Sequence, residues 1–267
     1  MKIGFVGIGN MGGAIFKSFM KNGGSIEKEV SVFDTDPIKL EAAKKEAGVF
    51  TCGGIKELVA KTEVIIMGIK PNMFDTVMPD VAEAYEDSKI LISMAAGITI
   101  SFLENHLGKT AKIIRIMPNT PATVGEGMTS VSRNCNITDE DMKRTLAILE
   151  TAGKAREVPE ELIHCVIGVS GSSPAYTYMY IDSLAEAAVK NGMGKDEALL
   201  FAAQSVLGAA KMVLETGVDP VQLRINVCSP GGATIEAVQK LQEAGFADVV
   251  EAGFQTAVEK SKLMSRV

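Results

Sequence analysis

Tryptophan is absent from this 267-residue sequence, and only two histidines and four cysteines are present. Neither His106 nor His164 has another metal-ligating residue at the spacing that metal sites use, so we expect no metal site. The four cysteines are far apart and form no C-x-x-C pair, a usage typical of reduced thiols that serve as small apolar residues in a cytoplasmic protein (Cys52, Cys135, Cys165, Cys228).

Long apolar runs and an excess of positive charge are also missing. No uninterrupted apolar run reaches about 18 residues, so we expect no membrane span. The net charge of -6 argues against a nucleic-acid partner, which would require a basic face. Residues 1–7 form a short apolar run that ends in glycine, which predicts a strand and not a leader peptide. With 46% hydrophobic residues, the chain is long enough for one large or two moderate globular domains.

A glycine-rich loop follows the first apolar run. Residues Gly7-Ile8-Gly9-Asn10-Met11-Gly12 have the pattern G-x-G-x-x-G, and a helical pattern begins at Ala14. In such a loop the first glycine permits a tight turn, the second lets the backbone approach a pyrophosphate, and the third lets helix and strand pack closely. The motif alone is weak evidence. Because a predicted strand precedes the loop and a predicted helix follows it, we expect the loop to bind a dinucleotide.

The second predicted strand, residues 30–33, ends at Asp34, about twenty residues after the last glycine of the loop. A carboxylate at this position binds a ribose 2′-hydroxyl and repels a 2′-phosphate, which favours NADH over NADPH. In a second interpretation, Asp34 or Asp36 caps the helix predicted from Pro37 to Ala47. One residue can fill both roles.

Further buried strands are predicted over residues 63–69, 89–94 and 111–117, with a last strand over 154–158. Strands that alternate with helices indicate a doubly wound parallel sheet, in which ligands bind beyond the carboxyl ends of the strands. We therefore expect the glycine loop and three later turns to surround one crevice (Lys70-Pro71, Ala95-Ala96-Gly97, Asn119-Thr120-Pro121). Lys70 either faces this crevice or is an ordinary solvated lysine.

The second half of the chain lacks strand patterns. From Pro159 onward, helical patterns alternate with turn signals, which predicts a dinucleotide-binding domain over 1–158 and a helical domain over 159–267. Two helices have apolar faces rich in alanine, one with Tyr178, Ile181, Ala185 and Ala188, the other with Leu199, Ala203, Val206, Ala210 and Val213. Such a helical layer serves as a dimer interface or as the core of its own domain.

Two helix starts in this half offer free N–H groups. Ser229-Pro230-Gly231-Gly232-Ala233-Thr234 reads as a start with Pro230 in the first turn, able to hold a small carboxylate or simply to cap the helix. Ser170-Gly171-Ser172-Ser173-Pro174 is similar. His164 is interpreted as a packed histidine rather than a catalyst. Because no Ser/His/Asp or Cys/His set and no carboxylate pair is apparent, the chemistry should come from the cofactor, which favours hydride transfer.

These motifs, taken in order along the whole chain, resemble those of pyrroline-5-carboxylate reductase. The Ser229-Pro230-Gly231-Gly232-x-Thr234 start is the most specific of them. The resemblance implies reduction of 1-pyrroline-5-carboxylate, a cyclic imine, to L-proline by NAD(P)H. It also implies a Rossmann-type parallel sheet followed by an all-helical dimerisation domain, in a homodimer or a larger homo-oligomer built of dimers, with the active site between the two domains.

The resemblance also implies the roles of individual residues. The substrate carboxylate would bind backbone N–H groups near Gly231, and the Thr234 hydroxyl, the catalytic group, would bind the ring nitrogen. Substrate-binding residues would be Ser172, Ser229, Gly231, Gly232, Ala233 and Thr234. Cofactor-binding residues would be Gly7, Ile8, Gly9, Asn10, Met11, Gly12, Asp34, Ile69, Lys70, Pro71, Ala95, Ala96, Gly97 and Asn119.

The chain departs from the family pattern at three positions. Ser173 replaces a glycine of Gly-Ser-Gly-Pro, Asp34 replaces residues that suit a 2′-phosphate, and Ile55 replaces a polar residue near the adenosine. The last two favour NADH. Two alternatives are a 3-hydroxyacid dehydrogenase-like enzyme and a non-catalytic NAD-binding protein of the same fold. The first requires a lysine base on a helix of the second domain, and the helix from Pro174 has no lysine before Lys190.

Overall fold

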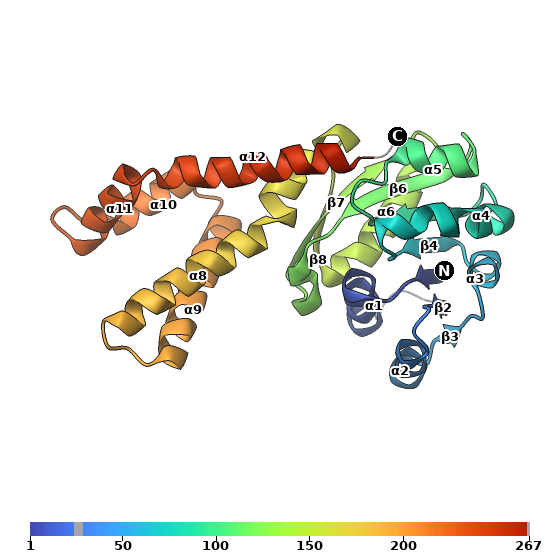
Figure 1. The fold of residues 1–267 in the computed structure, drawn as a ribbon, viewed down its shortest axis with the longest axis horizontal. Coiled ribbons are helices and arrows are strands. Elements are labelled where there is room, and N and C mark those ends of the chain that lie inside the picture. Colours follow the sequence, from blue (N-terminus) through green and yellow to red (C-terminus); the bar gives the residue numbers. More distant parts are fainter. Residues whose placement is uncertain (24–28, 266–267) are drawn as a thin grey trace. The chain divides into compact units, whose positions relative to one another are not determined.

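The computed structural model describes residues 1–23 and 29–265. Two compact units are present, one formed by Met1–Gly171 with Thr256–Val267 and the other by Ser172–Gln255. The first unit contains the sheet, and the second unit is helical in its regular structure (Figure 1).

The first unit is built on a sheet with the strand order β3-β2-β1-β4-β5-β6-β7-β8. Neighbouring strands run parallel from β3 through β6, so their carboxyl ends meet at one edge. This confirms the doubly wound sheet that the sequence predicts. The strands are β1 Lys2–Val6, β2 Glu29–Phe33, β3 Phe50–Thr51, β4 Val64–Met67, β5 Ile90–Ser93, β6 Lys112–Met117, β7 Gly127–Arg133 and β8 Gly153–Glu157.

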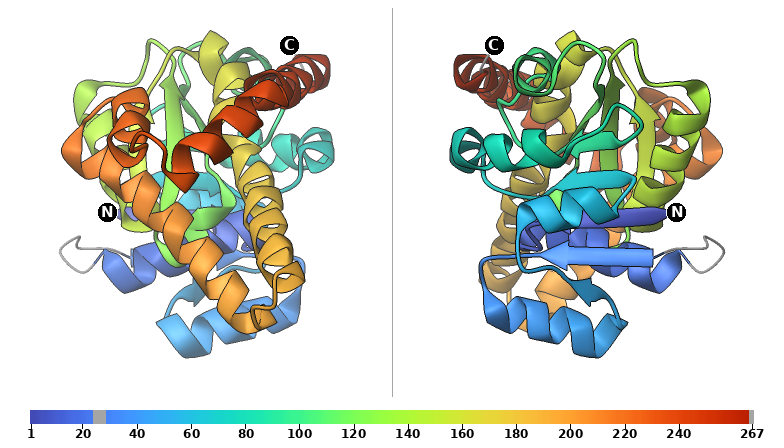
Figure 2. Two further views of the ribbon diagram at one scale, coloured as in Figure 1. Left: turned by 90° about the vertical axis from the view of Figure 1, so that its left-hand side faces the viewer. Right: turned by 90° about the vertical axis from the view of Figure 1, so that its right-hand side faces the viewer.

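Helices cover both faces of the sheet (Figure 2). On one face, α1 (Asn10–Asn22), α2 (Pro37–Ala47) and α6 (Asp139–Leu149) pack on residues such as Phe5 and Ile92. On the other face, α3 (Ile55–Lys61), α4 (Phe74–Ala84) and α5 (Ile100–Leu107) pack on residues such as Ile65 and Leu91. Because successive side chains of a strand point to opposite faces, the central strands are apolar in nearly continuous runs.

The antiparallel strand β7 was missed by the sequence analysis. It pairs antiparallel with β6 and parallel with β8, and its serines and threonine are buried, with Thr129, Ser130 and Ser132 each at most 3% exposed. The segment therefore lacks the apolar run on which the other strands were recognised. β3 was also missed, because it is only two residues long.

Shorter elements connect the sheet to the helical segments. The 3₁₀ turns are η1 Pro71–Met73, η2 Thr120–Val124, η3 Glu150–Ala152 and η4 Glu160–Leu162, followed by α7 Ile163–Val166 and the π-helical turn η5 Ile167–Gly171. The last part of α12 (Phe246–Met264) belongs to the first unit, where the Ser261 hydroxyl lies 2.8 Å from Nδ1 of His164.

The second unit consists of α8 (Ser173–Lys190), α9 (Lys195–Thr216), α10 (Pro220–Val227), α11 (Ala233–Glu243) and the beginning of α12. Helices α8 and α9 form an antiparallel pair (Figure 1). Buried alanines form the contact between them, with Ala185 of α8 packed against Ala198 and Ala202 of α9. On the apolar face predicted for α9, Ala203, Val206 and Val213 are partly buried, whereas Leu199 is 49% exposed.

Large apolar side chains remain exposed along the second unit, among them Leu200 at 66%, Phe201 at 67% and Val249 at 70%. Helix α9 is long and apolar enough to cross a membrane by length and composition, with a mean hydropathy of 1.4. Exposed apolar side chains in such number are typical of surfaces that bind another protein or a membrane.

Candidate active site

Three glycines close the nucleotide loop at the carboxyl end of β1. Gly7 has φ +87°, and its N–H donates to the carbonyl oxygen of Phe33 over 2.7 Å. A Cβ atom on Gly12 would clash with the carbonyl oxygen of Gly7, and so would one on Gly68, the residue after β4. The loop therefore needs glycine at all three positions. Gly68 was missed by the sequence analysis, because it contacts the loop only when β1 and β4 pair.

Gly9 differs from these three glycines. It precedes the first residue of α1 with φ -67° and ψ -158°, and an added Cβ would meet no atom within 4 Å. The N–H groups of the first turn of α1 have no side-chain cap. This open backbone at a helix N-terminus suits a pyrophosphate, which would occupy the space that a side chain would otherwise fill.

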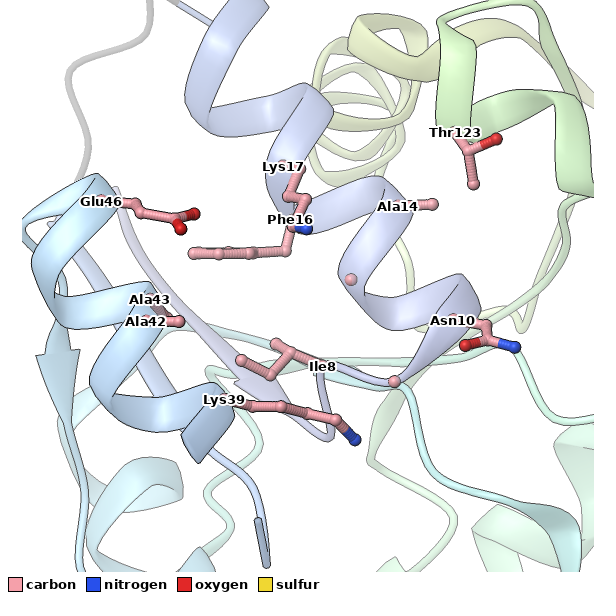
Figure 3. A pocket seen from close by; sticks show the side chains of 12 residues that line it. Ile8, Asn10, Ala14, Phe16, Lys17, Lys39, Ala42, Ala43, Glu46 and Thr123 are labelled. Atoms are coloured by element: carbon pink, nitrogen blue, oxygen red, sulfur yellow. The ribbon is translucent and has the colours of Figure 1, made fainter. Parts of the chain in front are cut away.

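A cavity of about 510 Å³ extends from this loop between α1 and α2. Ile8, Gly9 and Asn10 line its end at the loop, and Lys17 and Lys39 supply positive charge. Figure 3 shows Lys39 extending from α2 toward the turn that precedes α1.

The Asp34 carboxylate is bound to the glycine loop. One oxygen accepts a hydrogen bond from the Ile8 N–H over 2.8 Å, and the other accepts from the Asp36 N–H over 2.9 Å. The helix cap is a different residue, since the Asp36 carboxylate accepts from the Ile38 N–H at the start of α2. The structure thus gives the capping role to Asp36, and Asp34 lies at the end of β2 beside the loop.

The turns after β4 and β5 lie at the same edge of the sheet. After β4, Ile69 is partly buried, and its Cγ2 would crowd a Cβ atom on Gly7; Lys70 is exposed immediately before η1, which begins at Pro71. After β5, Ala95 and Ala96 lead to Gly97, whose φ is +81°.

Asn119, after β6, is engaged with the protein itself. Its Nδ2 donates to the carbonyl oxygen of Ser170 over 3.1 Å, and its Oδ1 accepts from the Met128 N–H over 2.8 Å. The side chain therefore ties the end of β6 to β7 and to the π-helical turn before Ser172.

In the second unit, the predicted helix start at 229–234 is a turn followed by α11. The helix begins at Ala233, so Pro230 lies before it. The prediction that Pro230 lies in the first turn of the helix was wrong. The Gly232 N–H donates to the carbonyl oxygen of Ser229 over 3.0 Å, and Gly231 has φ +69°. Proline followed by a glycine of positive φ is the sequence of a type II turn.

This turn leads into an uncapped helix start. The first-turn N–H groups of α11, including those of Ala233 and Thr234, have no helical acceptor, and no side chain of the described residues caps the helix. Both residues are exposed. The other serine-rich helix start is comparable. Ser172 immediately precedes α8, has no side-chain cap bond, and is followed by Pro174 in the first turn of the helix.

Burial lowers the pKa of His164, with further lowering by the charges of Arg115 and Lys262. Its hydrogen bond to Ser261 and its partial burial agree with the packed histidine that the sequence suggested. Burial likewise raises the pKa of the Cys52 thiol. Over residues 1–23 and 29–265, no group of three or more His, Cys, Asp or Glu side chains is placed to hold a metal ion.

A doubly wound sheet with a glycine turn after β1 and an acidic residue after β2 defines a dinucleotide-binding protein of the Rossmann class. Comparisons with known proteins refine this class. Residues 2–97 match the family described as NADP oxidoreductase coenzyme F420-dependent, and residues 160–264 match the family described as pyrroline-5-carboxylate reductase dimerisation.

Individual proteins are similar to this chain over nearly its whole length. Pyrroline-5-carboxylate reductase of Escherichia coli (strain K12) is 42% identical over 99% of this chain and 98% of its own length. The structure of the Coxiella burnetii pyrroline-5-carboxylate reductase has a TM-score of 0.93 at 32% identity, covering 99% of this chain and 98% of that one. The Plasmodium falciparum pyrroline carboxylate reductase with NADP bound has a TM-score of 0.87 at 32% identity, covering 100% and 98%. The chain therefore belongs to the pyrroline-5-carboxylate reductase family.

Proposed function

We propose that this protein reduces 1-pyrroline-5-carboxylate to L-proline with NAD(P)H, the last step of proline biosynthesis. One observation carries the proposal: a single chain of this family combines an open glycine loop for a dinucleotide with an uncapped start of α11 that suits a carboxylate. The nicotinamide cofactor, when bound, supplies a hydride. The imine carbon gains that hydride and the ring nitrogen retains a proton, so the products are the secondary amine and the oxidised cofactor.

The chain's own residues would orient the imine. We propose that the substrate carboxylate binds N–H groups at the start of α11, around Gly231, Ala233 and Thr234, with Ser229 and Ser172 as further polar contacts. The Gly232 N–H is already bonded within the turn, so Gly232 contributes its backbone shape. The Thr234 hydroxyl would form a hydrogen bond with the ring nitrogen, either as acceptor or as donor. No strong acid is required there, because a protonated imine already carries its proton.

The cofactor would lie along the strand-end edge. We assign the pyrophosphate to the loop from Gly7 to Gly12, which includes Ile8, Gly9, Asn10 and Met11, and the adenosine ribose to Asp34. Ile69, Lys70, Pro71, Ala95, Ala96 and Gly97 would line the nicotinamide half. Asn119 would act at this edge through its backbone, because both ends of its side-chain amide are bonded within the protein.

At the level of domains, we propose a dinucleotide-binding domain over 1–158 and a helical domain for substrate binding and dimerisation over 159–267. The match of residues 160–264 to a dimerisation family supports assembly of this chain into a homo-oligomer. We propose a homodimer or an assembly of dimers, whose interface covers the exposed apolar side chains of the second unit and requires no membrane. Cysteines that form no disulfide suit a cytoplasmic enzyme.

We further propose that NADH is preferred over NADPH. The Asp34 carboxylate is held in place by two backbone N–H groups, so it cannot turn away from a 2′-phosphate without breaking both bonds. Lys39, which together with Lys17 lines the cavity, lies 3.8 Å from the Asp36 carboxylate, which partly offsets its charge. A like-charge pair near 4 Å costs about 1 kcal/mol at the dielectric of water and about 4 kcal/mol at the effective dielectric near a protein surface, which corresponds to about fivefold or more in relative affinity.

A two-cofactor assay tests both proposals. The purified protein receives pyrroline-5-carboxylate with NADH or NADPH, and kcat/KM is measured for wild type, Asp34→Ser and Glu41→Gln. Turnover with higher kcat/KM for NADH is expected, with the ratio shifting at least about fivefold toward NADPH in Asp34→Ser. Glu41→Gln, which removes the charge of an exposed carboxylate on α2, should leave the ratio unchanged. Absence of turnover with both cofactors, when both bind, contradicts the reductase function. A wild-type preference for NADPH contradicts the role of Asp34.

A further inference from the structure

The turn Ala95-Ala96-Gly97 packs closely against the last turn of α12. Gly97 has φ +81°, and a Cβ atom there would clash with the carbonyl oxygen of Met264 in the last turn of α12. The close approach therefore requires glycine at this position. Residues 256–265, which include Met264, belong to the same compact unit as the sheet.

Glu160 is bound to the start of the helix that follows this turn. Helix α5 begins at Ile100, with Ile98 and Thr99 between it and the turn, and the Ile100 N–H donates to Glu160 Oε1 over 2.9 Å. The Thr99 hydroxyl accepts from the Phe102 N–H, so the helix start has both a capping side chain and a carboxylate. A negative charge at a helix N-terminus is favourable, because the unpaired N–H groups there carry partial positive charge.

The same carboxylate oxygen is bound by a buried arginine. Arg115 Nη1 donates to Glu160 Oε1 over 2.9 Å, and Arg115 itself is 1% exposed in β6. Its Nε and Nη2 are buried without a hydrogen-bond partner within the described part of the chain. Among the described residues, Arg115 therefore has the Glu160 carboxylate as its ion-pair partner. Such a buried cation fixes its counter-ion firmly, because separation of the two leaves an uncompensated buried charge.

The position of the turn suggests what this arrangement does. In a doubly wound sheet the two halves of a dinucleotide lie on either side of β1. The Asp34 side of β1, toward β2, is the adenosine side, so the turns after β4 and β5 lie on the nicotinamide side. A displacement of the turn after β5 would alter the placement of the nicotinamide ring and leave the adenosine half in place.

We propose that Glu160, fixed by Arg115, is a positioning residue for hydride transfer that sets the turn Ala95-Ala96-Gly97 through the start of α5. This role depends on the proposed reductase function. Glu160 does not contact the reacting atoms in this proposal. It acts through the Ile100 N–H, and Arg115 keeps its carboxylate oriented.

The test compares Glu160→Ala, Glu160→Gln and the control Glu161→Ala, in which a neighbouring exposed carboxylate is removed. Dissociation constants are measured for NADH and for ADP-ribose, which lacks the nicotinamide, together with kcat, KM and the thermal midpoint. Glu160→Ala should lower kcat and weaken NADH binding by about tenfold each while ADP-ribose binding changes less than twofold. Glu160→Gln keeps an oxygen acceptor for Ile100 and should recover much of this loss. Glu161→Ala should match wild type.

Two results overturn the proposal. One is an equal loss of NADH and ADP-ribose affinity, which would indicate a general loss of structure. The other is kcat and both affinities within twofold of wild type. If Glu160→Ala does not fold, the ratio of the NADH dissociation constant to the ADP-ribose dissociation constant is compared between Glu160→Gln and wild type. The proposal expects this ratio to rise at least about threefold in Glu160→Gln. The binding ratio does not depend on turnover, so a wild-type protein inactive on pyrroline-5-carboxylate would refute the reductase function and still leave the ratio measurable.

Discussion

Replacement of Gly9 by alanine separates cofactor binding from folding. The residue has φ -67° and ψ -158°, values open to alanine, and an added methyl group would meet no atom of the described residues within 4 Å. In the free protein the change should therefore be tolerated. With cofactor bound, the methyl group would occupy the space assigned to the pyrophosphate.

The expected magnitudes follow from these two states. Alanine at a compatible glycine position stabilises a fold by about 0.4–1 kcal/mol, whereas alanine before a helix is less favourable than glycine by a similar amount. The free energy of unfolding should thus change by less than about 1 kcal/mol. Loss of a hydrogen bond to a charged group costs about 1.5–3 kcal/mol, which raises the dissociation constant of NADH roughly 10- to 150-fold.

The assay combines urea unfolding of the free protein with NADH titration by fluorescence. Gly54→Ala is a matched control, since Gly54 also precedes a helix, α3, and also has no atom within 4 Å of an added Cβ. It should retain wild-type affinity. Gly68→Ala, whose Cβ would clash with Gly7, should lose stability and affinity together. If Gly9→Ala binds NADH as tightly as wild type does, the pyrophosphate does not lie at this loop and the reasoning fails.

Two further predictions concern single side chains. Thr234→Ala should lower kcat with pyrroline-5-carboxylate by about tenfold or more and leave the dissociation constant of NADH unchanged, because the hydroxyl is assigned to the imine nitrogen. Steady-state kinetics and NADH titration measure the two quantities. An equal loss of NADH binding would contradict this assignment. His164→Gln should reduce the loss of stability in acid. Burial and the Arg115 charge lower the pKa of His164 in the folded state, so the unfolded state binds more protons as pH falls through about 6.5, and the free energy of unfolding declines there. Urea unfolding of both proteins above and below that pH measures the difference; identical pH dependences would show that His164 does not contribute.

Local sequence determined the elements of the nucleotide-binding edge. The run Lys2–Val6 and the glycines that follow are sufficient to predict a strand, a turn and a helix, because each depends on the conformational limits of adjacent residues. Asp36 and Pro37 likewise mark the beginning of α2, where the structure has both the cap and the first-turn proline. The order of strands and helices then implied a doubly wound sheet, since parallel strands need crossover helices.

Only the tertiary structure decided which groups meet across the sheet. The proximity of Gly68 to Gly7, the bond from Arg115 to Glu160 and the use of Asn119 by Ser170 all join residues far apart in the chain. Their pairing depends on strand order and register, which local propensity does not encode. β7 was missed for a related reason, because its buried serines and threonine become strand residues through pairing with β6 and β8.

The start of α11 shows both contributions in one segment. Its sequence, Ser229-Pro230-Gly231-Gly232-Ala233-Thr234, was enough to predict a helix start with free N–H groups and to suggest a site for a carboxylate. The structure decided that the helix begins at Ala233 and that the Gly232 N–H is used inside the preceding turn. The residue types proposed to bind the substrate are thus set by sequence. Which N–H donors remain free depends on backbone hydrogen bonds, which exist only once the turn has folded.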